Sequence, residues 1–252
     1  MKKLGKKPAR ASTTLSFKDF FYAPNLPVPP ATFGHQDLVD EWHMLGNDAW
    51  GDCVWAGAGH LEYAWSLMGS RPRVRITTAD VLSDYAAVTG FAFTDATDQG
   101  TDMQAGAEYW RTTGIRDAVS NTSRHKIDCH VSLAIGDWDQ MILATYLFGG
   151  CGIGIELPKS AMSQNDLGVP WTVVPNSRID GGHFVPAVGR VASSNVVVVT
   201  WGTLQEMTQA FYERYSDEAR AYLSLDILDA KGLSPEGFDA TALRAYSANL
   251  GG

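Results

Sequence analysis

Cys53 stands where a thiol could act as a nucleophile. It follows the glycine-punctuated stretch LGNDAWGD at residues 45–52 and precedes residues 54–68, which hold no proline and almost no charge. Asp52 is an acceptable N-cap, so Cys53 would lie in the first turn of a helix. There the unpaired backbone N–H groups and the positive end of the helix dipole favour a thiolate, which can attack a carbonyl carbon.

Burial is the competing explanation for this cysteine. Free cysteine is among the most buried residue types, and a lone cysteine before an apolar helix is more often a packing residue than a nucleophile. His60 cannot serve as its base, because it lies two helical turns further along the same helix face, about 10 Å from Cys53. We expect His60 to be a core histidine, so a catalytic role for Cys53 needs a base from elsewhere in the chain.

The helix that begins at Cys53 should be central, because residues 54–68 leave hardly any polar face. The second half of the chain supplies strand-like runs that could pack against it. Residues 180–189 (DGGHFVPAVG) contain His183, and the β-branched residues 196–200 (VVVVT) precede Trp201.

These motifs resemble those of the papain-like cysteine peptidases. In that family an oxyanion-hole amide lies six residues before the nucleophilic cysteine, and a GGH- or DHA-type strand carries the general base. An Asn-Ser-Trp-Gly strand supplies the residue that orients the base. This sequence has Asn47 six residues before Cys53, and His183 lies eighteen residues before Trp201, which is the usual interval in the family.

The resemblance extends between these motifs in the same order along the chain. Residues 98–115 are similar to the family's Gly-Gly helix and its Tyr-Gly-Ile/Val turn, and residues 138–155 are similar to its next helix and strand. The resemblance covers residues 45–205, which no short motif could do alone. It implies an α+β, two-lobe fold in which a helical lobe with the central cysteine-bearing helix packs on an antiparallel, β-rich lobe.

The resemblance also implies roles for the site residues. Cys53 would be a thiolate paired with protonated His183, and Asn47 would hold the oxyanion. Counted back from Trp201, the family's orienting asparagine falls on Val199, so we predict that His183 lacks its usual hydrogen bond. Thr200, or an acid from elsewhere, would have to substitute. We therefore expect the pKa of Cys53 to lie between about 8.5 and the low values of His-paired cysteines.

Length and composition are those of a folded chain with a basic end. The 252 residues are 45% hydrophobic and 19% charged, with a net charge of −8. We divide them into a basic arm and proline-rich strap at 1–32 and one two-lobed papain-like domain at 33–252, with a C-terminal elaboration after Trp201. Residues 1–10 hold five basic and no acidic side chains. Such an arm is usually a solvated tail, although it could bind an acidic assembly partner.

Several ligands and locations are not expected. An acidic chain is a poor nucleic-acid binder, and residues 141–155 are too short to span a membrane. No apolar region follows the basic start, so no secretory signal is expected. The three cysteines are predicted to be free thiols. His125, Cys129, His130 and Cys151 lack the spacing of a zinc site, so neither a metal nor a cofactor is predicted. The expected location is the cytoplasm or a virion.

Three functions fit the sequence. The first is a cysteine peptidase or amidase of bacterial or bacteriophage type that acts on a peptide or amide substrate and is weakened by the missing asparagine. The second is a pseudoenzyme, a non-catalytic papain-like fold used as a structural or binding protein, such as a capsid-decoration or tail component of a phage virion. The third is a thiol acyltransferase on the same core.

Overall fold

The computed structural model describes residues 2–10, 27–118, 124–237 and 239. Most of the expected proline-rich strap (11–26) lies outside the described residues. The sequence also predicts a short helix at 241–248, and these residues too lie outside the described part of the chain. The described α-helices are α2 (Cys53–Met68), α3 (Thr78–Thr89), α4 (Met103–Thr112), α5 (Trp138–Phe148), α6 (Lys159–Asp166) and α7 (Gln209–Tyr215).

The strands form one large antiparallel sheet and a two-stranded ribbon. In the large sheet the order is β4-β9-β5-β6-β7-β8, with β1 paired to β6, and the ribbon joins β2 to β3. Two 3-10 helices complete the part of the chain that the structure describes. The bounds are β1 (Phe33–Gly34), β2 (Ile115–Arg116), β3 (Arg124–His125), β4 (Ile127–Ser132), β5 (Cys151–Pro158), β6 (Ile179–Arg190), β7 (Val196–Thr200), β8 (Thr203–Met207), β9 (Ser216–Ser224), η1 (Gln36–Leu38) and η2 (Leu225–Ile227).

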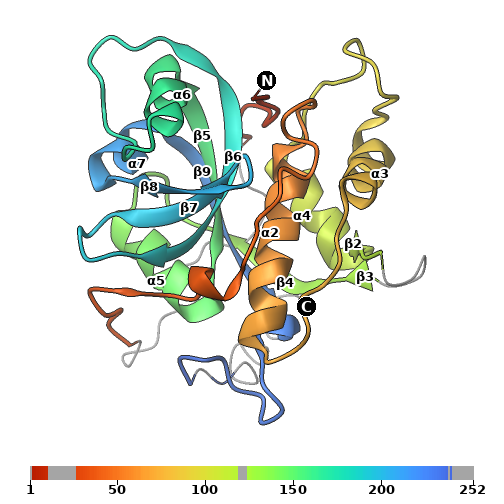
Figure 1. Cartoon of the computed structure of the whole chain (residues 1–252), viewed down its shortest axis with the longest axis vertical. Helices are drawn as coiled ribbons and strands as arrows, with labels where there is room; N and C mark the ends of the chain where they lie inside the picture. The colour runs from red at the N-terminus through yellow and green to blue at the C-terminus, as the bar shows by residue number, and fades with distance from the viewer. Residues whose placement is uncertain (1, 11–26, 119–123, 238, 240–252) are drawn as a thin grey trace.

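The sheet has an apolar core on each face. Side chains alternate along its strands, so Val197 and Val199 of β7 pack toward α2, whereas Val196 and Val198 pack toward α5 and α7. Figure 1 shows α2, α3 and α4 together on one side, with α2 alongside β6. The predicted α+β architecture, a helical lobe packed on an antiparallel β-rich lobe, is confirmed.

Helix α2 is buried along nearly its whole length, as its composition predicts. Its side chains are buried on every face except at Leu67. Gly57 lets the helix approach β6 closely, because a Cβ atom there would lie 2.2 Å from the Cε1 atom of Phe184. This close approach sets the start of α2 beside the middle of β6.

One expectation about the C-terminal part of the chain is wrong. We expected the segment after Trp201 to be an elaboration outside the papain-like core, but β9 lies inside the sheet, between β4 and β5. Its pairings with β5 and β4 run antiparallel along most of the strand. Strand β9 is therefore part of the core. Among the described residues, no helix is long and apolar enough to cross a membrane.

Candidate active site

Cys53 is the first residue of α2, as the sequence predicts. Asp52 takes the N-cap position, but its side chain makes no capping hydrogen bond and is fully buried. The Cys53 sulfur accepts a hydrogen bond from the backbone N–H of Phe184, with an N–Sγ distance of 3.4 Å. This bond joins the start of α2 directly to β6 at the residue that follows His183.

His183 is held in one orientation from two sides. Its Nε2 atom lies 2.8 Å from the hydroxyl oxygen of Thr200. Its ring stacks on Trp201, with the ring centroids 4.5 Å apart and an interplanar angle of 13°. The other ring nitrogen, Nδ1, is buried and has no hydrogen-bond partner among the described residues. Nδ1 is therefore the nitrogen left to exchange a proton with a reacting group.

The residues predicted to form the site all border one small cavity between α2, β6 and the end of β7. Asn47 is there with its side-chain Nδ2 donating to the carbonyl oxygen of Trp50 over 3.0 Å. The side-chain amide of Asn47 also acts on the neighbouring carboxyl of Asp52, whose pKa it lowers against the larger effect of burial. The structure brings together the four predicted site residues, Asn47, Cys53, His183 and Thr200.

Burial makes the neutral forms of the pair dominant in this structure. Loss of solvent raises the pKa of the Cys53 thiol to about 12, the N–H of Phe184 opposes that rise, and the charge of Asp52 adds to it. Loss of solvent lowers the pKa of His183 to about 3. Burial also raises the pKa of Asp52 well above its usual range. The expectation of a Cys53 pKa of about 8.5 or below is therefore wrong for this closed state.

The N-terminal arm lies against the site and adds to this burial. Residues 3–7 are hydrogen-bonded to segments of both lobes beside the cavity. The backbone N–H of Lys3 donates to the Asn47 carbonyl oxygen over 3.1 Å, and Trp201 Nε1 donates to the Lys3 carbonyl oxygen over 3.2 Å. Thr101 N–H donates to the Gly5 carbonyl oxygen over 2.7 Å. The exposed fraction is only 2% for Cys53 and 1% for His183.

The expectation that the arm is a solvated tail is therefore wrong for residues 3–7. Lys6 is 4% exposed, and its Nζ lies 2.8 Å from the Oδ2 atom of Asp217. The arm fits because glycines line its path. A Cβ atom at any of these glycines would approach an arm atom within about 3 Å; the glycines are Gly51, Gly100, Gly154, Gly181 and Gly182.

Solved structures identify the fold that carries this site. Xylellain, a cysteine protease from Xylella fastidiosa, has a TM-score of 0.67 at 14% identity, covering 88% of this chain and 96% of that chain. Procathepsin B from Trypanosoma congolense has a TM-score of 0.58 at 12% identity, covering 88% and 86%. A Carica candamarcensis cysteine protease in complex with E-64 has a TM-score of 0.55 at 11% identity, covering 77% and 99%.

This chain has the papain-like fold. No protein-family model matches the sequence, and no curated protein matches it. At 14% identity or less, the solved structures show the fold alone, so any reaction has to be inferred from the residues of this chain.

The hydrogen bond to His183 comes from Thr200, one of the two substitutes that the sequence allowed for the missing asparagine. Val199 is buried in the apolar core, but His183 does not lack a hydrogen bond, because the next residue, Thr200, supplies one. His60, in contrast, behaves as expected of a core histidine. Its Nε2 lies 3.0 Å from the carbonyl oxygen of His43, and burial lowers its pKa to about 4.

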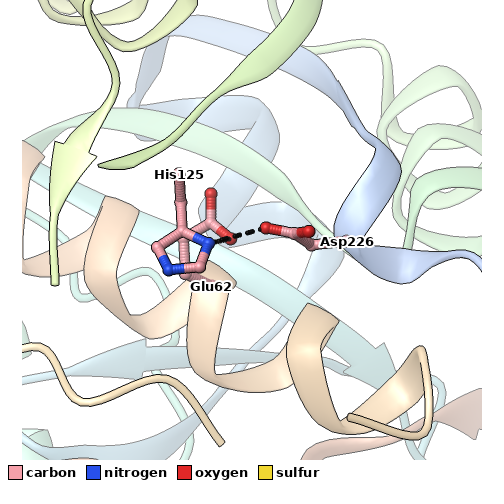
Figure 2. A group of neighbouring side chains, drawn as sticks. All are labelled: Glu62, His125 and Asp226. Atoms are coloured by element: carbon pink, nitrogen blue, oxygen red, sulfur yellow. Dashed lines mark hydrogen bonds and ion pairs between the residues drawn. The ribbon is translucent and has the colours of Figure 1, made fainter. Parts of the chain in front are cut away.

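A second group of ionisable side chains lies where α2, the ribbon and η2 meet. Figure 2 shows Glu62, His125 and Asp226 pointing toward one another. Their ligand-type atoms lie within 4.8 Å of each other, so this is a group that could hold a metal ion. His125 Nδ1 is 2.8 Å from Asp226 Oδ2, and His125 Nε2 is 3.1 Å from Asp117 Oδ2.

The positive and negative charges of this group compensate one another in a network of ion pairs. Burial alone would lower the pKa of His125, but the bond to Asp226, the charge of Glu62 and the bond to Asp117 raise it to about 9. Burial raises the pKa of Glu62 well above its usual range, which favours its neutral form. Arg71 adds a second positive charge against Asp226. We therefore interpret the network as structural.

The sequence did not reveal this network, because its members come from distant segments without regular spacing. The available signal was Glu62, an acid within an otherwise apolar helix. The other histidine and cysteines that we weighed as metal ligands lie elsewhere. His130 Nδ1 is 3.2 Å from an Arg220 nitrogen, and Cys151 Sγ is 3.2 Å from the hydroxyl oxygen of Thr145. All three cysteines are free thiols.

Proposed function

We propose that this chain is a papain-like cysteine peptidase or amidase in which Cys53 is the nucleophile and His183 the proton carrier. The observation that carries the proposal is the state of His183. Thr200 holds its Nε2, whereas Nδ1 is unpartnered among the described residues and borders the same cavity as Cys53. The Nδ1 atom of the core histidine His60 is also unpartnered among the described residues, so the position of His183 matters as well: the next residue, Phe184, binds the Cys53 sulfur through its backbone N–H.

The reaction follows from these positions. The Cys53 sulfur attacks the carbonyl carbon while its proton passes to Nδ1 of His183, and the imidazolium then protonates the leaving amine. Water, deprotonated by the same nitrogen, attacks the resulting thioester, releases the acid and restores the thiol. The backbone N–H of Cys53 and the side-chain amide of Asn47 would hold the oxyanion, each worth about 3–4 kcal/mol in the transition state.

The arm must move before this reaction can start. In the closed state the thiol and imidazole are both neutral, because burial sets the pKa of Cys53 at about 12 and that of His183 at about 3. Withdrawal of residues 3–7 would admit water and substrate to the cavity. Hydration would remove the desolvation that raises the pKa of Cys53 and lowers the pKa of His183. It would therefore favour the thiolate–imidazolium pair.

One observation favours a second function. A cleft filled by the chain's own arm, with its cysteine and histidine neutral, is also what a non-catalytic papain-fold protein would present. In that case the fold would serve as a structural or binding module, for example in a phage virion, and the pair around Cys53 would be vestigial.

Peptide cleavage separates the two functions. The full-length chain, and a Lys6→Met variant that loosens the arm, are incubated with a complex peptide mixture, and new peptide ends are identified by mass spectrometry. The peptidase proposal predicts cleavage that Cys53→Ala and His183→Ala abolish. If no new ends appear with either chain while Cys53 is accessible to alkylation, the non-catalytic function is correct.

A further inference from the structure

The side chain of Lys6 is unusually buried for a lysine. Its side-chain exposure is 0%, and its Nζ donates to Asp217 Oδ2 and to the Lys7 carbonyl oxygen, each over 2.8 Å. Lysine is almost never fully buried unless it is paired with an acid. A side chain of this kind marks a pocket whose walls fit an alkyl stem and whose end binds a cation.

The pocket walls come from separate segments of the fold. Gly154 of β5 leaves room for the lysine stem, because a Cβ atom there would lie 2.1 Å from Lys6 Cε. Met103, at the start of α4, borders the same space from the other lobe, since its sulfur is 2.8 Å from that Cβ position. Asp217 of β9 closes the end. The pocket is therefore apolar along its length and acidic at its base.

The carboxylate of Asp217 can accept more hydrogen bonds than Lys6 donates to it. Its Oδ2 binds the ammonium group, but its Oδ1 is buried without a hydrogen-bond partner among the described residues. The neighbouring acid, Glu218, is already bound by Arg220, with an Nε–Oε1 distance of 2.9 Å. A guanidinium group presents paired N–H donors, so arginine could use both oxygens of Asp217.

The backbone on either side of Lys6 is held by main-chain hydrogen bonds that any polypeptide could make. Lys6 N–H donates to the Gly182 carbonyl oxygen over 3.0 Å, and the carbonyl oxygen of Thr101 accepts from Lys7 N–H over 3.0 Å. Main-chain bonds of this type do not depend on the side chains of the bound peptide. Because Gly182 immediately precedes His183, the pocket lies next to the reacting groups.

We propose that the pocket formed by Met103, Gly154 and Asp217 selects a lysine or arginine side chain of a bound polypeptide. The inference deepens the proposed function and rests on it for the claim that the polypeptide is a substrate. In the closed state Lys6 occupies the pocket as an internal competitor. An acidic base in an otherwise apolar pocket discriminates against apolar side chains, because they would leave the half-buried carboxylate of Asp217, whose side chain is 20% exposed, without a cation.

The arm is also held beside Cys53. The backbone N–H of Gly5 acts to lower the pKa of the Cys53 thiol, against the larger effect of burial. The Gly5 carbonyl oxygen accepts from Thr101 N–H. The backbone that precedes Lys6 is therefore fixed next to the thiol.

The first test measures how firmly the pocket holds Lys6 in the full-length chain. The readout is the rate at which iodoacetamide alkylates Cys53. Lys6→Met keeps the stem and removes the charge, and Asp217→Asn removes the charge at the base. Each should raise the rate roughly tenfold or more, since a hydrogen bond to a charged group is lost. The double variant should gain little over either single variant.

Lys3→Met is the matched control, because Lys3 belongs to the same arm but its Nζ makes only an exposed ion pair with Asp95, over 3.9 Å. Its alkylation rate should stay within about twofold of the wild type. Equal acceleration by Lys3→Met and Lys6→Met would overturn the inference, because general arm charge would then explain both effects.

The second test separates the pocket from the chemistry. Acetylated, amidated peptides with the sequence of residues 4–7 carry lysine, arginine or norleucine at the position of Lys6. With the Lys6→Met chain, the lysine and arginine peptides should protect Cys53 from alkylation at roughly tenfold lower concentration than the norleucine peptide. Asp217→Asn should remove that difference. Equal protection by all three peptides would overturn the inference.

Cleavage of a peptide library by the Lys6→Met chain then distinguishes the inference about the pocket from the proposal of peptidase activity. Selection of lysine or arginine beside the cleaved residue supports both proposals. Cleavage without such selection supports the peptidase and overturns the pocket. Protection by basic peptides without any cleavage supports the pocket and overturns the peptidase.

Discussion

The Nε2 atom of His183 lies 2.8 Å from the hydroxyl oxygen of Thr200, the last residue of β7. This bond gives a short side chain the task that the papain-like resemblance assigned to an asparagine. A hydroxyl accepts the Nε2–H hydrogen bond and so favours the tautomer in which Nδ1 is free to accept a proton. It adds no charge, so it orients the imidazole without stabilising its charged form as a carboxylate would.

Thr200→Val tests this role. The substitution keeps the shape of the side chain and removes the acceptor, so the imidazole loses its fixed tautomer. We expect kcat for peptide cleavage to fall by at least about tenfold, with the free energy of unfolding reduced by about 1–3 kcal/mol. Thr200→Ser, which keeps the hydroxyl, should retain most of the activity. Equal kcat in the valine and serine variants would contradict an orienting role.

Asp52→Asn should make Cys53 more reactive. Where the Asp52 carboxyl is ionised, its charge adds to the raised pKa of the Cys53 thiol. Burial favours the neutral carboxyl, so an uncharged amide should shift the alkaline part of the pH profile of alkylation toward lower pH. Asp48→Asn removes an exposed acid from the same loop and serves as the control. A profile that moves equally in both variants would show a general loop effect instead.

The Glu62–His125–Asp226 network predicts how stability depends on pH. Because the folded pKa of His125 is about 9, against 6.5 for the ordinary group, its contribution is complete below about pH 6.5 and is lost as the pH rises toward 9. Glu62 acts in the same direction, because its folded pKa is also raised and its buried charge destabilises the fold at higher pH.

Urea unfolding measures this loss. Between about pH 6 and pH 9 the free energy of unfolding should fall by roughly 2 kcal/mol from His125, allowing for solvent that screens the partly exposed ring. His125→Gln should flatten the pH dependence of the free energy of unfolding. A slope unchanged in His125→Gln would refute the assignment.

Gly57→Ala should separate α2 from β6. The added Cβ atom would lie 2.2 Å from the ring of Phe184, in a packed core with no room for it. We expect a loss of about 1–3 kcal/mol in the free energy of unfolding. Phe184→Leu in the same chain should recover part of it by freeing space. Additive losses in the double variant would show that the two residues do not clash.

Much of the site could be predicted from local sequence. Asp52, the glycine loop and the apolar run place the start of α2 at Cys53, and the interval from His183 to Trp201 places His183 on a strand. The fold followed from the order of these motifs. Each signal lies within one element or in the fixed spacing between two, so it depends little on the rest of the chain.

The closed cleft could not be predicted in this way. Residues 1–10 have the composition of a solvated tail, and only contacts with distant residues bury Lys6: the backbone of Gly182, the space beside Gly154 and the carboxylate of Asp217. The hydroxyl of Thr200 was also ambiguous, because sequence counting placed Val199 in the orienting position. Such features depend on surfaces that the chain assembles only when it folds.

Removal of residues 2–10 gives the most direct test of the account. The truncated chain should melt about 5 °C or more below the full-length chain, since buried backbone bonds and the Lys6 ion pair are lost.

The decisive readout is alkylation of the three cysteines by iodoacetamide, followed by mass spectrometry between about pH 5 and pH 9. In the full-length chain the half-buried Cys129 should react before the buried Cys53 and Cys151. In the truncated, folded chain Cys53 should react fastest, with an apparent pKa far below the closed-state value of about 12, and His183→Ala should slow it. If Cys53 stays inert over that range while the truncated chain remains folded, the central claim of a nucleophile held behind the arm is contradicted.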